Sequence, residues 1–319
     1  MFAVLAHSAG YAIFIALGYA LVSIGVLPRA SGRVLSALMV CVTLPASIIV
    51  GLNGHAVAVE DLRFLVLGVL CNVVALGASW AFARRWEGDR GALAMVSVSG
   101  CNVGGFALPL ASGLLPGRAL VQMAVFDIGN SIMCLGLNKG FASMVLGGRG
   151  GAKVRDLLGS LVGSAPVMTY LLMLGLCLVG RQVPSPLAEI VGVAGEANPL
   201  VAMMVIGTSM VGERRGGSKV GEVARLVLLR MAVSVVQVVG VLVVPFVSAR
   251  ILGGFAPSFS PDDRLVASVL LLAPVAAMGT VFARQLGLDE EVAAKVNSVY
   301  TPISLVAMSL AIGLSGVAR

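Results

Sequence analysis

The sequence predicts an all-α protein that crosses a membrane many times. Of its 319 residues, 58% are hydrophobic, 40 are glycine and 12% are charged. Soluble domains carry roughly 25% charged residues, so this chain has too few polar side chains to cover a surface that faces water. A helix of roughly 20 apolar residues spans the hydrocarbon layer of a bilayer. We therefore expect about ten such helices and no separate soluble domain.

Charged residues and clusters of Gly and Pro divide the chain into apolar segments. The first segment has no Lys or Arg before it and continues to Leu27. It exceeds the roughly 7–15 residues of a signal-peptide core, so we interpret it as a membrane helix. The ten predicted segments are 5–27, 33–52, 62–83, 91–115, 119–138, 159–179, 187–211, 223–247, 264–286 and 292–316.

Basic residues are concentrated in alternate connections between these segments. The even-numbered connections hold five of the 22 Lys and Arg residues, namely Arg63, Arg118, Arg181, Arg250 and Arg264. The odd-numbered connections hold fifteen, and basic loops favour the cytoplasmic side. We therefore expect a multi-pass protein of the plasma membrane, the inner membrane in a bacterium, with both termini outside the cytoplasm. These loops account for the net charge of +7, and no nucleic-acid partner is indicated.

The two halves of the chain have matching features. We expect residues 1–138 to form a first five-helix repeat, 139–158 a cytoplasmic linker loop, and 159–319 a second repeat. The second repeat would be inverted, because five is an odd number of crossings. A weak echo links the second segment of each half: Thr43-Leu44-Pro45-Ala46 in one and Ala197-Asn198-Pro199-Leu200 in the other.

The fourth segment of each half contains a predicted helix break. In the first half, Gly, Asn and Pro residues cluster between Gly100 and Pro109, and Pro109 cannot donate a hydrogen bond to the Gly105 carbonyl. In the second half, Pro274 frees the Leu270 carbonyl in the same way. Breaks at corresponding positions of two halves are typical of a transporter's substrate site. The alternative for an isolated Pro is a plain kink.

Asp127 is the one acidic residue predicted to lie deep in a helix. A charge there costs at least about 2.5–3.5 kcal/mol, and Asn130 lies on the same helix face. We expect Asp127 to carry a coupling proton or to bind a sodium ion together with Asn130. The alternative is a structural role in helix packing.

Other polar residues in the segments are given structural interpretations. We expect Asn72 and Gln237 to form hydrogen bonds between helices. Arg230 should snorkel, or pair, near the cytoplasmic end of its helix. His7 and His55 are interpreted as surface residues, and the five cysteines as small apolar residues with no disulfide or metal site.

At these residues the chain resembles the auxin efflux carrier family, in its bacterial branch, over nearly its whole length. The motifs are Leu44-Pro45-Ala46, Asn102-Val103-Gly104-Gly105-Phe106 with Pro109, Phe126-Asp127-Ile128-Gly129-Asn130, Asn198-Pro199-Leu200 with Gly207, and Pro274 to Thr280. The resemblance implies two inverted five-helix repeats, an architecture shared with the bile acid–sodium symporters. It also implies broken helices 4 and 9 that cross at the substrate site, beside a scaffold of helices 1, 2, 6 and 7.

Known substrates of this family are organic anions: auxin in plants, and small carboxylates such as malonate or malate in bacteria. The plant carriers have a long central loop and a Pro between two Asn residues in helix 4. This chain has a short loop, and Asn102 is followed by Val103 and Gly104. The departure favours small carboxylates over auxin.

Half-helices that cross would direct their positive N-terminal ends at the cavity, which suits a carboxylate. Asn102 and Thr280 would add neutral donors, with no Lys or Arg in the site. The candidate substrate-binding residues are Asn102, Val103, Gly104, Gly105, Asn130, Met278, Gly279 and Thr280, and the helix-break residues are Pro109 and Pro274.

Catalytic and nucleotide-binding motifs are absent from the sequence. We expect no enzyme activity, no catalytic residue, no cofactor and no metal. The predicted function is secondary-active transport of small organic anions, with a proton or a sodium ion as a possible coupling partner. The alternatives are a channel, a non-transporting membrane sensor and an intramembrane enzyme. Either direction of transport, drive by the membrane potential alone, and a homodimer all stay open.

Overall fold

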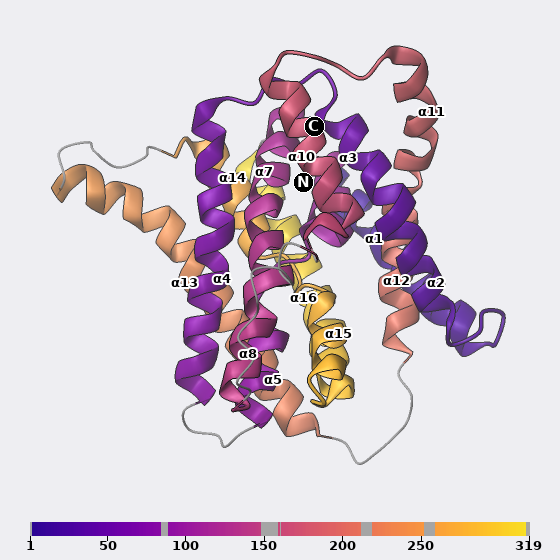
Figure 1. Cartoon of the computed structure of the whole chain (residues 1–319), viewed down its shortest axis with the longest axis vertical. Helices are drawn as coiled ribbons and strands as arrows, with labels where there is room; N and C mark the ends of the chain where they lie inside the picture. The colour runs from indigo at the N-terminus through magenta and orange to yellow at the C-terminus, as the bar shows by residue number, and fades with distance from the viewer. Residues whose placement is uncertain are drawn as a thin grey trace.

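The protein is helical throughout the part of the chain that the structure describes. The computed structural model describes residues 2–83, 89–147, 159, 161–211, 219–251 and 259–316. These residues form no strand, and their one extended pairing is an isolated bridge between Cys101 and Val275. The helices run mostly along the long axis of the molecule (Figure 1). An all-α membrane protein, as predicted, is the fold class that these apolar helices indicate.

Within the described residues, seven helical stretches are long and apolar enough to cross a membrane. They are Val4–Ser23, Ser31–Leu52, Val59–Phe82, Gly117–Val145, Ser185–Met210, Val220–Val243 and Glu290–Ser315. Each matches one of the ten predicted segments. The other three predicted segments, 91–115, 159–179 and 264–286, contain only shorter helices. Ten crossings and the inverted repeat therefore stay predictions.

In the described part of the first half, twelve labelled helical elements end with α8. These are α1 (Phe2–Ser23), α2 (Ser31–Leu38), η1 (Met39–Thr43), α3 (Leu44–Leu52), η2 (Val59–Asp61), α4 (Leu62–Ala83), α5 (Asp89–Val98), η3 (Val103–Ala107), α6 (Leu108–Ser112), α7 (Gly117–Ile132), and η4 (Met133–Asn138) continuing into α8 (Lys139–Val145). The fifth predicted segment thus stays helical beyond residue 138, and α8 occupies the start of the predicted linker. Residues 148–158 of that linker lie outside the described residues.

The second half begins with α10. Its elements are α10 (Ala165–Leu178), α11 (Ser185–Glu196), α12 (Asn198–Met210), α13 (Val220–Ile251), α14 (Pro261–Leu271), α15 (Met278–Gln285) and α16 (Glu290–Ser315). Two breaks stand out among them. The fourth predicted segment is divided between α5 and η3, and the ninth is divided between α14 and α15. In Figure 1, α14 lies in the upper half of the molecule and α15 in the lower half.

The helices pack as two groups. In the first group, α1 packs on α12, and α3 packs on α10 and α11. In the second group, α4 packs on α5 and α7, α13 packs on α14 and α16, and α15 packs on α5 and α16. The groups meet where α7 contacts α3 and α10, and where α12 contacts η3 and α16.

Glycines allow the closest helix pairs in each group. A Cβ at Gly207 of α12 would lie 2.0 Å from the Ile15 carbonyl oxygen of α1. A Cβ at Gly129 of α7 would lie 2.2 Å from the Leu65 carbonyl oxygen of α4. Small residues let helix backbones approach one another, which is the usual way that helices associate in a bilayer. These two pairs therefore anchor the two groups separately.

Polar side chains inside the helix bundle partly follow the sequence predictions. Gln237 donates to the Cys71 carbonyl at 2.7 Å, and Asn72 bonds to Asn130 at 3.1 Å, so both inter-helix roles are confirmed. His55 is exposed, as predicted. His7 is partly buried against Gly113 instead, because α1 packs there and its ring meets the edge of Tyr11.

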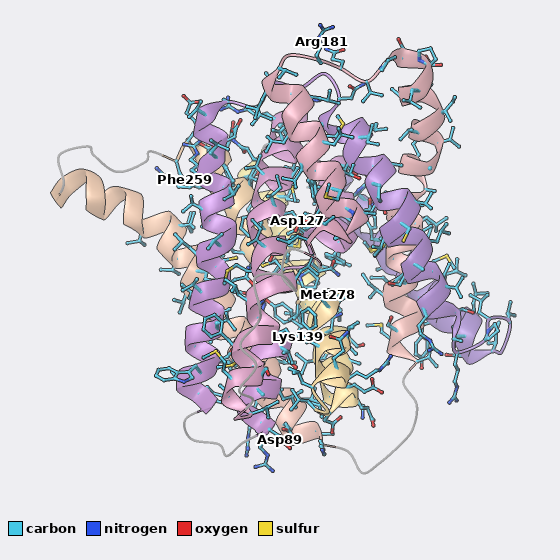
Figure 2. The ribbon with its side chains drawn as sticks, viewed as in Figure 1. Asp89, Asp127, Lys139, Arg181, Phe259 and Met278 are labelled. Carbon is cyan, nitrogen blue, oxygen red and sulfur yellow. The ribbon has the colours of Figure 1, made fainter. Side chains whose placement is uncertain are left out.

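The orientation of the molecule can be tested at its two ends. Asp89 and Arg181 lie at opposite ends of the bundle (Figure 2). We predict that Asp89→Cys in intact cells resists a membrane-impermeant maleimide and that Arg181→Cys reacts, because the basic connections favour the cytoplasm. Labelling of the unsubstituted protein measures the background from the native cysteines. Labelling of Asp89→Cys but not Arg181→Cys would reverse the orientation.

Candidate functional site

The two helix breaks pair with each other. After α5, Gly100 adopts a left-handed φ of 84°, and Cys101 and Asn102, the latter with φ −81° and ψ 74°, lie outside any helix. Cys101 pairs with Val275 in an antiparallel bridge, and the Asn102 N–H donates to the Pro274 carbonyl at 2.8 Å. A side chain at Gly100 would lie 2.5 Å from the Cys134 sulfur, so only glycine fits this turn. The breaks therefore satisfy part of each other's free backbone.

Asn130 of α7 satisfies the backbone of Cys101. Its side-chain oxygen accepts from the Cys101 N–H at 3.0 Å, and its side-chain nitrogen donates to the Cys101 carbonyl at 2.8 Å. The same nitrogen donates to Asp127 Oδ1 at 2.9 Å, and the same oxygen accepts from Asn72 at 3.1 Å. All four hydrogen-bonding positions of this amide are thus used. Asn130 thus supplies the backbone hydrogen-bond partners that a neighbouring strand would otherwise give Cys101.

Arg230 of α13 does not snorkel, and that prediction is wrong. Its side chain is 1% exposed, and its two Nη atoms donate to the Val98 and Ala273 carbonyls, each at 3.0 Å. The Val98 carbonyl is the last of α5, where a helix leaves acceptors unpaired and carries a partial negative charge, and the Ala273 carbonyl lies two residues past Leu271, the end of α14. The guanidinium also lies 3.4 Å from the Cys101 sulfur and 5.6 Å from the Tyr300 ring centre. Arg230 therefore holds both helix ends at the crossing.

A cavity of about 50 Å³ lies at the crossing, between the two helix groups. The residues that precede the two restarting helices, Asn102 before η3 and Ala277 before α15, both line it. Its other polar lining comes from Ser36 of α2, Ser209 of α12, and Asn297, Ser298 and Thr301 of α16. Among the described residues, none of the side chains that line this cavity is charged. In the described part of the chain, no hydrogen bond to the Asn102 side chain is formed, so its amide is available to a ligand.

A second, smaller cavity of about 10 Å³ lies on the other face of the crossing. Ser99, Asn138, Ala276, Met278 and Gly279 are among its lining residues. Ala276 lines this cavity and Ala277 lines the larger one. The turn before α15, in which Gly279 donates to the Ala276 carbonyl, therefore lies between the two cavities.

Asp127 lies behind the first break and lines neither cavity. It is 6% exposed, and a Cβ at Gly104 of η3 would lie 3.4 Å from its Oδ2 atom. Tyr170 of α10 lies close enough to interact with it electrostatically, although the Tyr170 hydroxyl has no hydrogen bond of standard geometry. Asp127 is thus in contact with the break of one helix group and with a helix of the other.

Three asparagine amides lead to this carboxylate from the far side. Asn138 donates to Asn72 at 3.0 Å, Asn72 donates to Asn130 at 3.1 Å, and Asn130 donates to Asp127. Every donor points in the same direction, so the aligned amides favour negative charge on Asp127. The Asn138 oxygen, at the opposite end of the chain of amides, is buried and has no partner.

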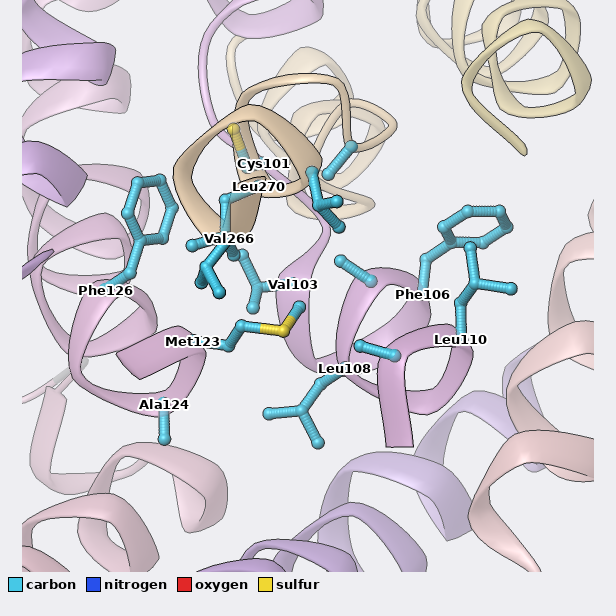
Figure 3. Close-up of a cluster of buried hydrophobic side chains, with 14 of the residues drawn as sticks. Cys101, Val103, Phe106, Leu108, Leu110, Met123, Ala124, Phe126, Val266 and Leu270 are labelled. Atoms are coloured by element: carbon cyan, nitrogen blue, oxygen red, sulfur yellow. The ribbon is translucent and has the colours of Figure 1, made fainter. Parts of the chain in front are cut away.

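The structure divides the predicted substrate-binding residues among three places. Asn102 and Gly105 line the larger cavity, and Met278 and Gly279 line the smaller one. Val103 faces the apolar core beside Leu108 and Met123 (Figure 3). Gly104 and Asn130 adjoin Asp127, and Thr280 is partly buried and lines neither cavity.

The two predicted break residues have different positions. Pro274 lies within the second break, and its carbonyl accepts the hydrogen bond from Asn102. Pro109 lies past the first break, in the first turn of α6, and its carbonyl accepts from the Tyr11 hydroxyl at 2.9 Å. Figure 2 places Asp127 and Met278 between the two ends of the bundle.

Sequence reasoning missed Arg230 and the polar residues of α16. Asn297 and Thr301 are four residues apart, with Pro302 directly after them. That spacing puts both side chains on one helix face, and Thr301 donates to the Asn297 carbonyl at 2.7 Å. This polar pair in an apolar helix was the available signal.

We predict that Arg230→Met destabilises the protein by about 2–5 kcal/mol, because it leaves two buried carbonyls without donors. Arg230→Lys should recover only part of this loss, since a single ammonium cannot bond both carbonyls with the planar, two-armed geometry of the guanidinium. Unfolding in detergent would measure both, with the exposed Arg225→Met on the same helix as the control. Equal stability of Arg230→Met and the control would contradict the proposed clamp.

Comparison with known proteins leaves the family open. A scan of protein-family models found no match to the sequence, and a search of curated proteins found none either. The resemblance to the auxin efflux carriers therefore depends only on the motifs quoted above.

Proposed function

We propose that the protein is a secondary-active transporter that carries small organic anions through the crossing. The observation that supports this most directly is that both restarting helices begin at one cavity, at Asn102 and Ala277. A helix N-terminus presents unpaired N–H groups and a partial positive charge, which suit a carboxylate. The neutral hydroxyls and amides around it would fix the orientation of the substrate.

The position of the cavity suits alternating access. It has one wall from α2, η1 and α12 and the other from the breaks and α16, which belong to different helix groups. Movement of one group against the other would expose such a site to each side of the membrane in turn. A volume of about 50 Å³ holds a few water molecules, so a carboxylate would require the two walls to separate.

The packing pattern favours an inverted repeat of ten helices. Segment 1 packs on segment 7 through α1 and α12, and segment 6 packs on segment 2 through α10 and α3. Segments 3 and 5 pack through α4 and α7, and segments 8 and 10 through α13 and α16. Exchanging the two halves turns the pair of segments 1 and 7 into the pair of segments 6 and 2, and the pair 3 and 5 into the pair 8 and 10. The echo motifs also meet, since Thr43 donates to Asn198 at 3.0 Å.

The same pattern agrees with the auxin efflux carrier resemblance, and we propose that family for the chain. Its implied scaffold of helices 1, 2, 6 and 7 corresponds to the first helix group. Its implied pair of broken helices corresponds to the two breaks. On this basis we propose a location in the plasma membrane, with the basic connections in the cytoplasm.

Asp127 is the proposed coupling residue. Sodium would need free oxygen ligands, but the Asn130 oxygen already accepts from Cys101 and Asn72. A proton needs only the carboxylate itself. The geometry therefore supports a proton at Asp127 over a sodium ion shared with Asn130.

Uptake by purified protein in proteoliposomes tests the proposal. We expect saturable uptake of radiolabelled pyruvate or malonate, and Asn102→Ala should raise the half-saturating concentration about 5- to 150-fold. That range corresponds to about 1–3 kcal/mol for a desolvated hydrogen-bond donor. Asn53→Ala removes an amide far from the cavity, in the loop beside Val183, and should leave this concentration unchanged.

Two results would count against the proposal. Uptake that rises linearly without saturation would indicate a channel. An unchanged half-saturating concentration in Asn102→Ala would remove this residue from the substrate site.

A further inference from the structure

Arg230 brings a full positive charge into the crossing without a carboxylate partner. None of the ion pairs in the described residues includes it. Its two hydrogen bonds go instead to the Val98 carbonyl at the end of α5 and to the Ala273 carbonyl, which directly follows the C-cap of α14. A helix C-terminus carries about half a negative charge, so two of them offset roughly one guanidinium. This part of the crossing is therefore close to electrically neutral.

The two helix starts at the cavity form the opposite half of the charge balance. η3 continues into α6, and α15 begins nearby, so their N-termini together contribute about one positive charge. Asp127 lies beside the first of them, next to Gly104. When Asp127 is ionised it offsets that charge. The crossing with an empty cavity is then nearly neutral as a whole.

The surroundings of Asp127 contain few other groups that could change charge. Tyr170 faces it from α10, Cys101 from the first break, and Cys134 from η4. Arg230 approaches from α13, on the far side of the Cys101 sulfur. The remaining contacts are the Asn130 amide and Gly104 of η3. Asp127 is therefore the carboxylate whose protonation changes the balance.

We infer that one monoanionic carboxylate and one proton bind this site together, with the anion in the larger cavity and the proton on Asp127. This inference depends on the transport function proposed above. Protonation of Asp127 leaves the crossing with about one uncompensated positive charge, which costs energy in a medium of low dielectric constant. One monoanion in the cavity removes that cost. Each ligand therefore strengthens binding of the other by the same factor.

The charge balance also defines the substrate class and the driving force. A dianion would leave one uncompensated negative charge, so the site favours monocarboxylates over dicarboxylates. A proton and a monoanion together carry no net charge across the membrane. A proton gradient then drives accumulation of about tenfold for each unit of pH difference, and the membrane potential drives none.

The test compares two three-carbon acids in proteoliposomes, pyruvate as the monoanion and malonate as the dianion. A pH step is imposed at zero potential, and a potential step is imposed at equal pH. We expect pyruvate to accumulate about tenfold for each pH unit and to ignore the potential, with weaker uptake of malonate. Protein-free liposomes give the leak of undissociated acid.

Two variants test whether Asp127 carries the coupled proton. Asp127→Asn imitates the protonated carboxyl, so it should retain pyruvate exchange while losing accumulation driven by pH. Cys101→Ser should keep the pH dependence. Should Asp127→Asn fail to fold, wild-type binding decides the question: pyruvate affinity, measured by thermal shift, should fall about tenfold for each unit of pH above neutrality.

Different results would refute the coupled binding of proton and monoanion and the transport function itself. Saturable uptake that follows the potential and not pH, or that prefers malonate, would overturn the inference and leave the transport function standing. Loss of pH dependence in Cys101→Ser with retention in Asp127→Asn would overturn it as well. Absence of saturable uptake and exchange for both acids would contradict the transport function itself.

Discussion

The need to pair every backbone polar group inside a bilayer governs this structure. A helix break in the middle of a membrane leaves N–H and C=O groups that water cannot reach, each at a cost of several kcal/mol. Here the two breaks bond to each other through Asn102 and Pro274. Asn130 binds the freed peptide groups of Cys101, and Arg230 binds the last carbonyl of α5 and the Ala273 carbonyl just after α14. The crossing is held by side chains from α7 and α13.

This pairing leaves the positive helix starts free for a ligand. Arg230 lies close to the negative ends and does not line the larger cavity. Among the described residues the cavity lining has no charged side chain, so the anion preference proposed above would come from backbone and neutral donors. Asp127 contacts η3 on one side and α10 on the other, which places a titratable group between the two helix groups. In the proposed transport cycle, substrate binding and movement of the helix groups would meet at this place.

Composition and periodicity predicted the all-α membrane class and the two segments that contain the breaks, because Gly and Pro act locally on the backbone. The first break lies at Gly100–Asn102, however, before the predicted break residue Pro109. The position of Arg230 could not be predicted this way. Its partners, Val98 and Ala273, come from segments far apart in the sequence and meet only through the crossing. For the same reason the predicted site residues separated into two cavities and a buried network. Spacing along a chain does not reveal which face of an extended segment a residue occupies.

Hydrogen exchange of the backbone amides within 99–106, followed by mass spectrometry, tests most directly whether the breaks are bonded as described. The Cys101 and Asn102 amides should exchange as slowly as those of the flanking helices, although they are not helical, because both have buried acceptors. In Asn130→Ala, exchange should become faster at Cys101 first, since that amide loses its acceptor. Exchange in the wild-type protein as fast as in an exposed loop would show that the breaks are not paired.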